Sequence, residues 1–433
     1  MRNILVLFFL LFQFYLGAQE MIVVSKADVL AAVQEHNNTI KMSKQDVLMA
    51  KGDYEQTNAI LLPNISASHT AIATTNPLMA FGSKLNQGIL TQGDFNPAIL
   101  NNPSEVQDYA TRITVEQPLL NFDGFYQRKA AKAKLNATEL QANRVNDYLE
   151  LEVEKAYMQL QLAYKAVEVL EKAKITALEN KRIATNNFVQ GYLQKSDVLA
   201  VEVRVTEIEN QLHYAKSNIQ NASNGLSVLM NDDSYAMLQP SDSLTIASAD
   251  TKTMFFSETR TDILAMESAT KAYSDMHKAD QMSFLPSLNA FGTYELHDDE
   301  LFKGATDGYL VGAALTWTLF EGGKRFGKFK KSKAEFEKSK LELDQYKAES
   351  QVELNRAKRM LQDAKNNLEL TTLALSQTQE SLRIRKNRFE QGLEKTTDLL
   401  SAETQFAQKQ LEYFTTIFNH NYALAYVQFL TKE

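Results

Sequence analysis

Two stretches of the chain alternate between apolar and polar residues. In the stretch 309–319, large apolar side chains share one face, at Tyr309, Val311, Ala313, Leu315, Trp317 and Leu319. In the stretch 109–116, the same alternation brings together Tyr109, Thr111, Ile113 and Val115. A period of two predicts β-strands. Weaker alternation precedes each stretch, at 65–74 and 288–297, so we expect four strands of about ten residues, the length that a tilted membrane strand needs.

Two other stretches carry apolar residues at alternating spacings of four and three. The first set is Leu149, Val153, Ala156, Leu160, Ala163, Val167 and Leu170, and the second is Leu354, Ala357, Leu361, Ala364, Leu368 and Thr371. Sustained 4-3 spacing predicts coiled-coil packing between helices, which explains both stripes without a ligand site. No proline lies in 124–231 or after Gly322. The stretch from Gly124 to Gln190 can therefore form a helix of about 65 residues, or ~100 Å.

The chain follows one plan twice. The segment 188–197 matches the segment 389–398 at an offset of 201 residues (389 − 188), and both begin with Phe-x-Gln-Gly. Earlier matches pair 62–66 with 285–289 and 118–120 with 318–320. Agreement at several separated points in the same order indicates an internal duplication.

These patterns divide the chain into consecutive segments. We expect a signal peptide at 1–18, N-terminal helices at 19–62, a first transmembrane strand pair at 63–122, a first helical hairpin at 123–231, an inter-repeat linker at 232–256, a helix at 257–284, a second transmembrane strand pair at 285–321 and a second helical hairpin at 322–433. The segment 76–107 holds three prolines with many Asn and Gly between two strands, which predicts a long extracellular loop.

The first residues predict export. Met1-Arg2-Asn3 carries a positive charge, residues 4–16 are apolar except for Gln13, and small residues end at Ala18. This is the pattern of a secretory signal peptide, so we expect the mature chain to begin at Gln19. The apolar run is too short for a transmembrane anchor, which needs ~20 residues.

Composition narrows the chemistry. The chain has no cysteine, which excludes disulfides, thiol catalysis, Cys-based metal sites and a lipid anchor on a mature N-terminal Cys. The formal net charge of −7 is mild for 433 residues, so we expect no nucleic acid as a partner. The six histidines are scattered, and no triad order, phosphate loop or metal cluster is present in the sequence. We therefore expect no cofactor, no metal and no enzymatic activity.

Four strands cannot span a membrane alone, because an open sheet edge in hydrocarbon leaves backbone groups unpaired. Transmembrane barrels have at least eight strands. Several identical chains must therefore complete one barrel. Two chains would supply eight strands and three would supply twelve, and this argument does not choose between them.

The doubled order of motifs resembles TolC-like outer membrane efflux proteins. The resemblance rests on the signal peptide, the repeated strand-strand-helix-helix plan, the sequence Trp-Thr-Leu-Phe-Glu-Gly-Gly at 317–323 and the Phe-x-x-Gly-x5-Asp-x-Leu turns. It implies a mainly α fold with a membrane β-barrel portion: long coiled-coil hairpins and four transmembrane strands per chain, in two repeats, with the barrel completed by trimerisation.

The resemblance also implies location, partners and function. The homotrimer would lie in outer-membrane lipid of a Gram-negative bacterium and extend into the periplasm. It would act as an efflux conduit with a periplasmic adaptor (membrane fusion protein) and an inner-membrane pump of the RND, ABC or MFS type. The same conduit in type I protein secretion is an alternative that the sequence leaves open. A secreted coiled-coil scaffold without a pore is a distant alternative, since it gives the strands no purpose.

The family places the two hairpin turns at the periplasmic entrance, with the turn of the second copy nearer the axis. The resemblance implies that Asp398, beside Gly392, forms one acidic ring, whereas a second acidic position of the family is Ser401 here. Asp197 and Gly191 are the first-copy counterparts. A structural interpretation competes: aspartates in a first helical turn favour the helix dipole, and both glycines suit helix C-caps.

Two other groups have candidate roles. Cations precede the second turn, at Arg383, Arg385, Lys386 and Arg388, and we attribute them to the helix C-terminus rather than to adaptor docking. On the strand 309–319 we expect Tyr309, Val311, Leu315 and Trp317 to face lipid, with Trp317 near a membrane boundary. Packing of Trp317 against another chain is the alternative.

Overall fold

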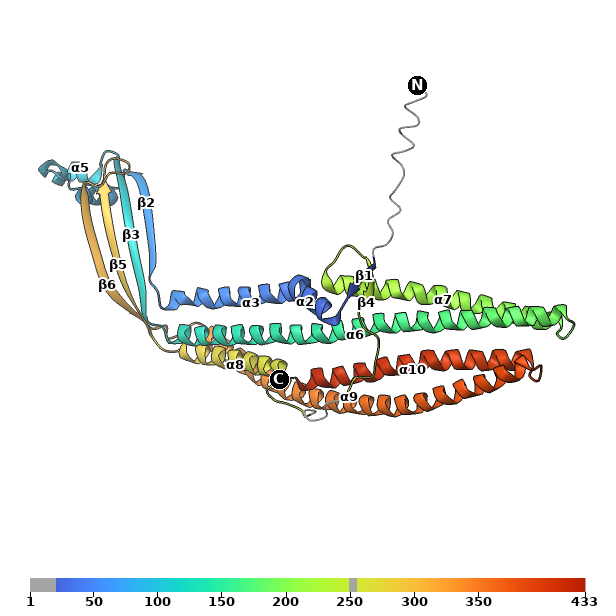
Figure 1. The fold of residues 1–433 in the computed structure, drawn as a ribbon. Coiled ribbons are helices and arrows are strands. Elements are labelled where there is room, and N and C mark those ends of the chain that lie inside the picture. The colour runs from blue at the N-terminus through green and yellow to red at the C-terminus, as the bar shows by residue number, and fades with distance from the viewer. Residues whose placement is uncertain (1–20, 249–254, 433) are drawn as a thin grey trace, which may run out of the picture. The chain divides into compact units, whose positions relative to one another are not determined.

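The computed structural model describes residues 21–248 and 255–432, which form two compact units (Figure 1). The expected signal peptide lies outside the described residues. The helical unit comprises the described parts of Met1–Gln45, Leu140–Leu264 and Tyr346–Glu433, and the strand unit comprises Asp46–Glu139 and Ala265–Gln345. Four helices contribute residues to both units: α3 (Asn38–Gln56), α6 (Phe122–Val189), α8 (Thr261–Met282) and α9 (Lys324–Glu390).

The strand unit contains one antiparallel sheet in the order β2-β3-β5-β6. Its strands are β2 (Asn64–Thr74), β3 (Val106–Leu120), β5 (Ser287–Asp298) and β6 (Thr306–Thr316). The two strongly alternating stretches are β3 and β6, and the two weaker ones are β2 and β5. The register of β3 against β5 shifts between Pro118 and Leu120, where proline cannot donate a backbone hydrogen bond. Strand β6 ends at Thr316, so Trp317 and Leu319 follow the strand rather than ending it.

The register gives the sheet one apolar and one polar face, because directly paired residues of antiparallel strands share a face. Leu315 pairs with Leu288, and Val311 pairs with Gly292, which in turn pairs with Val115. Residues on this apolar face are Ile65, Ala67, Tyr109, Ile113, Val115, Leu288, Ala290, Tyr294, Tyr309, Val311, Ala313 and Leu315. The opposite face carries Asp108, Arg112, Glu116, Glu295 and His297, and Arg112 contacts Glu295 at 2.6 Å.

The connection from β2 to β3, expected as a loop, contains short helices. They are α4 (Pro77–Asn86), the 3-10 helix η2 (Gln92–Phe95) and α5 (Pro97–Asn101). Asn76 and Asn96 cap α4 and α5 through their side-chain oxygens, and the first position of each helix is a proline. Proline is well tolerated there because that residue has no helical partner for an N–H. The remaining short helix of the strand unit is η1 (Thr57–Ile60).

The helical unit consists of two long hairpins with short elements attached. Hairpin 1 joins α6 to α7 (Lys195–Met230), and hairpin 2 joins α9 to α10 (Thr396–Thr431). The paired lengths are nearly equal, 68 and 36 residues in hairpin 1 and 67 and 36 in hairpin 2. No helix in the part of the chain that the structure describes combines the length and apolar character needed to cross a membrane.

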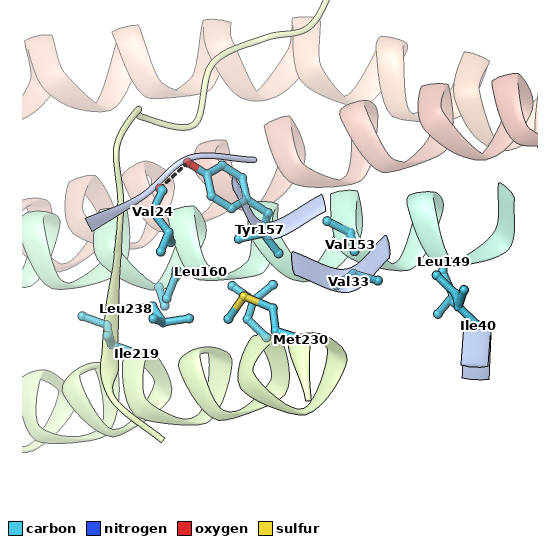
Figure 2. Close-up of a cluster of buried hydrophobic side chains, with 13 residues drawn as sticks. Val24, Val33, Ile40, Leu149, Val153, Tyr157, Leu160, Ile219, Met230 and Leu238 are labelled. Carbon is cyan, nitrogen blue, oxygen red and sulfur yellow. Dashed lines mark hydrogen bonds between the residues drawn. The ribbon is translucent and has the colours of Figure 1, made fainter. Parts of the chain in front are cut away.

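The 4-3 stripes lie in the hairpin cores. Leu149, Val153 and Leu160 of α6 pack with residues of α7 and of the short helix α2 (Lys26–His36), as Figure 2 shows. In hairpin 2, Leu354 and Ala357 pack with Val427 and Leu430 of α10. The packing explains why both stripes are apolar, as the coiled-coil spacing predicts.

A short parallel sheet, absent from the sequence expectations, fastens the linker. Strand β1 (Met21–Val24) pairs with β4 (Met237–Pro240), which lies inside the segment expected as an inter-repeat linker. Tyr157 donates to the Val24 carbonyl at 3.2 Å, the bond drawn in Figure 2. Tyr164 donates to the Leu238 carbonyl at 3.0 Å. These bonds tie both strands to α6.

A buried charge network holds the start of α8 against hairpin 2. Arg260 is 2 % exposed and donates to Asp262 at 2.6 Å, to the Leu430 carbonyl at 3.2 Å and to Ser350 at 2.9 Å. Tyr346 donates to Asp262 at 2.6 Å. Burial opposes ionisation of Asp262, but the bonds from Arg260 and Tyr346 outweigh it, so the net effect lowers the pKa of Asp262.

Candidate functional site at the hairpin tips

Both hairpin turns close in the same way. The N–H of Gly191 bonds the Phe188 carbonyl at 3.0 Å, and the N–H of Gly392 bonds the Phe389 carbonyl at 3.0 Å. The next residue of each turn bonds back five positions, Tyr192 to Asn187 at 2.8 Å and Leu393 to Arg388 at 2.9 Å. This is the Schellman pattern, and the glycines have φ of 79° and 72°, in the left-handed region. Space around each glycine is open, so the backbone angle is what requires glycine.

The two candidate aspartates differ in their partners. The Asp197 carboxylate accepts a hydrogen bond from the Gln194 backbone N–H at 3.1 Å and so caps the start of α7. Asp398 is exposed in the first turn of α10, and its carboxylate has no hydrogen bond or ion pair among the described residues. Asp197 thus has a structural partner at the start of its helix. The Asp398 side chain is exposed to solvent.

Ion pairs account for the arginines before the second turn. Arg385 and Arg388 both bind the carboxylate of Glu394, at 2.6 and 2.9 Å, and the Glu394 side chain is 10 % exposed. Arg383 pairs with Glu380 at 2.7 Å. These bonds brace the turn from α9 across to the residues before α10. They leave Asp398 outside the network.

A buried polar contact that sequence analysis did not single out joins the two hairpins. Asn180 of α6 donates its side-chain N–H to the carboxylate of Glu403 of α10, and the two residues are 2 % and 8 % exposed. Arg204 of α7 is 7 % exposed nearby, pairs with Glu207 at 3.2 Å and has a buried Nε without a protein partner. Arg204 and Glu403 line a cavity of about 110 Å³, which is large enough for water.

The sequence offset of 201 residues allows this contact to be compared with hairpin 1. Glu403 corresponds to Glu202, which pairs with Lys181 inside hairpin 1 at 3.1 Å and is 42 % exposed. The counterpart of Lys181 is Leu382, which lines the same cavity as Glu403. Without a lysine opposite it, Glu403 takes a hydrogen bond from the other hairpin. The sequence signal was therefore a lost partner within the repeat.

Burial raises the pKa of the Glu403 carboxyl, although the bond from Asn180 and the charges of Arg204 and Lys386 act in the other direction. Because burial is the larger effect, the Glu403 carboxyl becomes protonated more readily than an exposed glutamate. Lys172 also lines the cavity.

Three of the four expected membrane-facing residues share one face of the sheet in the strand unit, and the fourth follows the last strand. Tyr309, Val311, Leu315 and Trp317 are 79 %, 69 %, 68 % and 60 % exposed, and the first three lie on the apolar face of the sheet. Trp317 follows β6, and its indole N–H donates to the Phe284 carbonyl at 3.0 Å. No group of three or more metal-ligating side chains occurs within residues 21–248 and 255–432. The tips and the apolar face are thus the two surfaces with candidate roles.

Comparison with known proteins covers most of the chain. The model of the family described as outer membrane efflux protein matches residues 29–232 and 257–416. The CmeC outer membrane channel of Campylobacter jejuni has a similar fold, with a TM-score of 0.81 at 16 % identity over 94 % of this chain and 85 % of that one. The outer membrane protein VceC of Vibrio cholerae gives a TM-score of 0.79 at 18 % identity over 93 % and 95 %.

A membrane protein from Pseudomonas aeruginosa gives a TM-score of 0.80 at 17 % identity, over 94 % of this chain and 93 % of that one. These identities are low, so the three structures establish a shared fold only. No curated protein sequence matches the chain significantly.

We predict that Glu403→Gln raises the melting temperature at pH 7 and that this gain shrinks toward pH 4. The raised folded pKa means that Glu403 favours the folded state fully below its unfolded pKa near 4.5 and loses that contribution as the pH rises through the folded value. Glutamine stays neutral throughout and can still accept from Asn180. Circular dichroism melts from pH 4 to 8 measure the difference. Glu202→Gln, at the exposed counterpart, is the control, and equal shifts for both variants at every pH would contradict the prediction.

Proposed function

The chain is a member of the outer membrane efflux protein family, and we propose that three copies assemble into a conduit from the periplasm to the exterior. Membership establishes an outer membrane efflux channel of TolC-like fold. The trimer, the closed twelve-stranded barrel and the partners are the proposal. The observation that carries it is the two-faced sheet, which has an apolar surface for lipid and a polar surface for water.

The sheet fits a membrane wall in length as well as in polarity. From Tyr309 to Trp317 the chain advances eight residues, roughly 27 Å if it were fully extended as in a strand, and barrel tilt reduces its height toward the ~25 Å apolar band of outer-membrane barrels. Tyr294 pairs with Tyr309 near the end of β6 that is remote from Trp317. Aromatic residues therefore lie near one end of the apolar face and, at Trp317, just beyond its other end, as they would in barrel girdles.

The helical unit supplies independent support for assembly. Besides the buried stripe of Leu354 and Leu368, α9 exposes Val352, Leu370 and Leu373 at 65 %, 67 % and 55 %. Leu370 and Leu373, three residues apart, form an uncovered apolar surface that has a reason to pack against another chain, whereas Arg356, Arg359 and Asp363 separate them from Val352. In the proposed trimer, that surface joins neighbouring copies into the wall of a periplasmic tunnel.

Efflux is the function that the family supports, and the proposed partners are a periplasmic adaptor and an inner-membrane pump. Type I protein secretion uses the same geometry and stays the alternative, because no described residue distinguishes the two cargoes. The identity of the pump that is recovered with the channel separates them.

We expect the purified protein to be a trimer that conducts ions. Native mass measurement in mild detergent should give three times the mass of the processed chain, and reconstituted protein should open steady channels in planar bilayers. Affinity purification from cross-linked membranes should also recover an adaptor and a pump. A stable monomer without conductance would remove the proposed function.

Asp398 is the proposed ion-attracting residue of the entrance. In a trimer whose second hairpins lie nearest the axis, three exposed Asp398 carboxylates converge. At ~6 Å and an effective dielectric near 20, each pair repels by about 3 kcal/mol. Bound cations relieve this repulsion, as they do at acidic rings of cation-conducting pores. Such a ring repels anions from the entrance and binds multivalent cations, which then block the pore.

We therefore expect Asp398→Ala to reduce cation preference and weaken block by divalent cations, with trimer assembly unchanged. Asp197→Ala is the matched variant, because the same residue type at the same turn position is used there as a helix cap. It should lower stability by about 1 kcal/mol and leave ion selectivity intact. Single-channel recording with reversal potentials measures both. Equal selectivity in wild type and Asp398→Ala would reduce Asp398 to a helix-start carboxylate.

We expect the fluorescence of Trp317 to mark the periplasmic boundary of the outer membrane. Its indole N–H is already bonded to Phe284, so the ring is held while 60 % of the residue stays exposed. We expect lipids with quenchers attached near the headgroup to reduce its fluorescence more strongly than lipids with quenchers deep in the chain. Trp317 is the one tryptophan of the chain, so no other residue contributes to the signal. Absence of quenching at every depth would place Trp317 against another copy instead.

A further inference from the structure

The connection from β2 to β3 folds onto one face of the strand unit. Antiparallel pairing puts the end of β2, the start of β3, the end of β5 and the start of β6 at one end of the sheet. Figure 1 shows the short helices around α5 gathered at this end of the strands. In the proposed conduit this is the outer end, because the opposite strand ends continue into helices.

Buried polar contacts fix α4 to the polar face there. The Asp108 carboxylate accepts from Gln87 at 3.0 Å and from Ser83 at 3.4 Å, and His297 contacts it at 3.2 Å. All four residues are at most 9 % exposed. Gln87 also donates to the Gln107 carbonyl at 2.7 Å. Asp108 and His297 share the face of Arg112 and Glu295, opposite to the apolar face.

The connection between β5 and β6, at the same end of the sheet, contacts the opposite face. Between β5 and β6, Phe302 stacks on His69 with ring centroids 4.6 Å apart. His69 pairs with Thr111 on the apolar side of the sheet. The contrast shows that α4 is directed to the polar side specifically, which in a closed barrel is the lumen.

The connection is braced internally. Lys84 binds Asp94 at 2.7 Å, and Phe81 contacts Phe95 edge-on with centroids 5.6 Å apart. The bond from Lys84, aided by those from Thr91, lowers the pKa of Asp94 to about 2. The segment 76–105 is thus a folded element. Two side-chain contacts hold it together internally, and several hydrogen bonds connect it to the sheet.

The free side of α4 is apolar. Ala80, Ser83 and Gln87 follow helical spacing and form the buried side. Leu78 and Leu85, one heptad apart, lie on the opposite side with Gly82 between them, and they are 82 % and 58 % exposed. Met79, Phe95 and Ile99 add further exposed apolar surface at 50 %, 60 % and 43 %. Exposed apolar surface of this kind is unfavourable in water and typically marks an interaction site.

We propose that the segment 76–105 is an outer lid, and that the Leu78–Gly82–Leu85 side of α4 packs against the same side of the other two copies above the barrel. The inference rests on the proposed trimeric conduit. A closed barrel directs three copies of α4 toward one axis, and the small Gly82 lets the helices approach closely. Lipid is the other possible occupant of an apolar side, but α4 is attached to the polar face, away from the surface that lipid covers.

The lid has a consequence for permeation. Three apolar helix sides around a narrow mouth exclude water, and hydrophobic constrictions control channels by dewetting. The buried Asp108 contacts hold the base of each α4 during this closure. Release of the contacts among the three copies, rather than unfolding of each lid, then opens the mouth.

Cysteine cross-linking tests the contact directly, because the native chain has no cysteine. Leu78→Cys protein in membranes, oxidised with copper phenanthroline, should give a disulfide-linked dimer on non-reducing gels, since two of three thiols can pair. Ile113→Cys is the control: it is 44 % exposed on the apolar face of a central strand and should stay monomeric on the same gels.

A second variant tests the closure. Leu78→Glu combined with Leu85→Glu should raise unitary conductance about two-fold or more, because a charged rim stays wet. Native mass measurement of each variant establishes trimer assembly separately, so its failure counts against the proposed function. A trimer in which Leu78→Cys does not cross-link and the double variant conducts like wild type overturns the lid. A bimane label at position 78 that is quenched by lipid-borne quenchers would also overturn it, in favour of lipid.

Discussion

The unpaired edges of β2 and β6 are the constraint on which the rest of the architecture depends. In the described chain each of these strands pairs on one side only, and a backbone group left unpaired in hydrocarbon costs several kcal/mol. The sheet can enter a membrane only when another copy supplies the missing partners. In the proposed conduit, closure by copies also multiplies the helices and gives the exposed Leu370 and Leu373 of α9 a partner. The helical unit of a single chain has several small cores rather than one.

Sequence patterns predicted the elements that extend far enough to show a period. Alternation found β3 and β6, and the 4-3 stripes found the seams of α6 and α9, because each residue there faces one constant environment. The strands β1 and β4 have four residues each, too few for a period to stand out. For α4 and α5 a signal was present: Asn76-Pro77 and Asn96-Pro97 combine an N-cap residue with proline at the first helical position. Prolines also occur in loops, and the sequence analysis therefore predicted a loop where these two helices lie.

The sequence predicted the two glycines that close the hairpin turns but not the side-chain contacts around them. Equivalent turns need equivalent backbone angles, so Gly191 and Gly392 were readable from sequence. Side-chain roles depend on neighbours that the two copies do not share. Asp197 finds the Gln194 N–H while Asp398 stays free, and Glu403 is buried because Leu382 stands where hairpin 1 has Lys181. No period reveals such a change, but comparison of the two copies position by position does.

Two kinds of restriction follow from these differences, and they respond to different agents. In the proposed conduit, charge acts at the tips, where the exposed Asp398 would attract cations, and salt weakens this attraction over a Debye length of about 8 Å. Apolar contact acts at the proposed lid, where contacts between copies of Leu78 and Leu85 would exclude water and salt would have little influence. In the proposed conduit, a solute must therefore satisfy an electrostatic condition at one restriction and a wetting condition at the other. A motion that separates the hairpins, which are joined through the buried Glu403–Asn180 contact, changes the first condition and leaves the second intact.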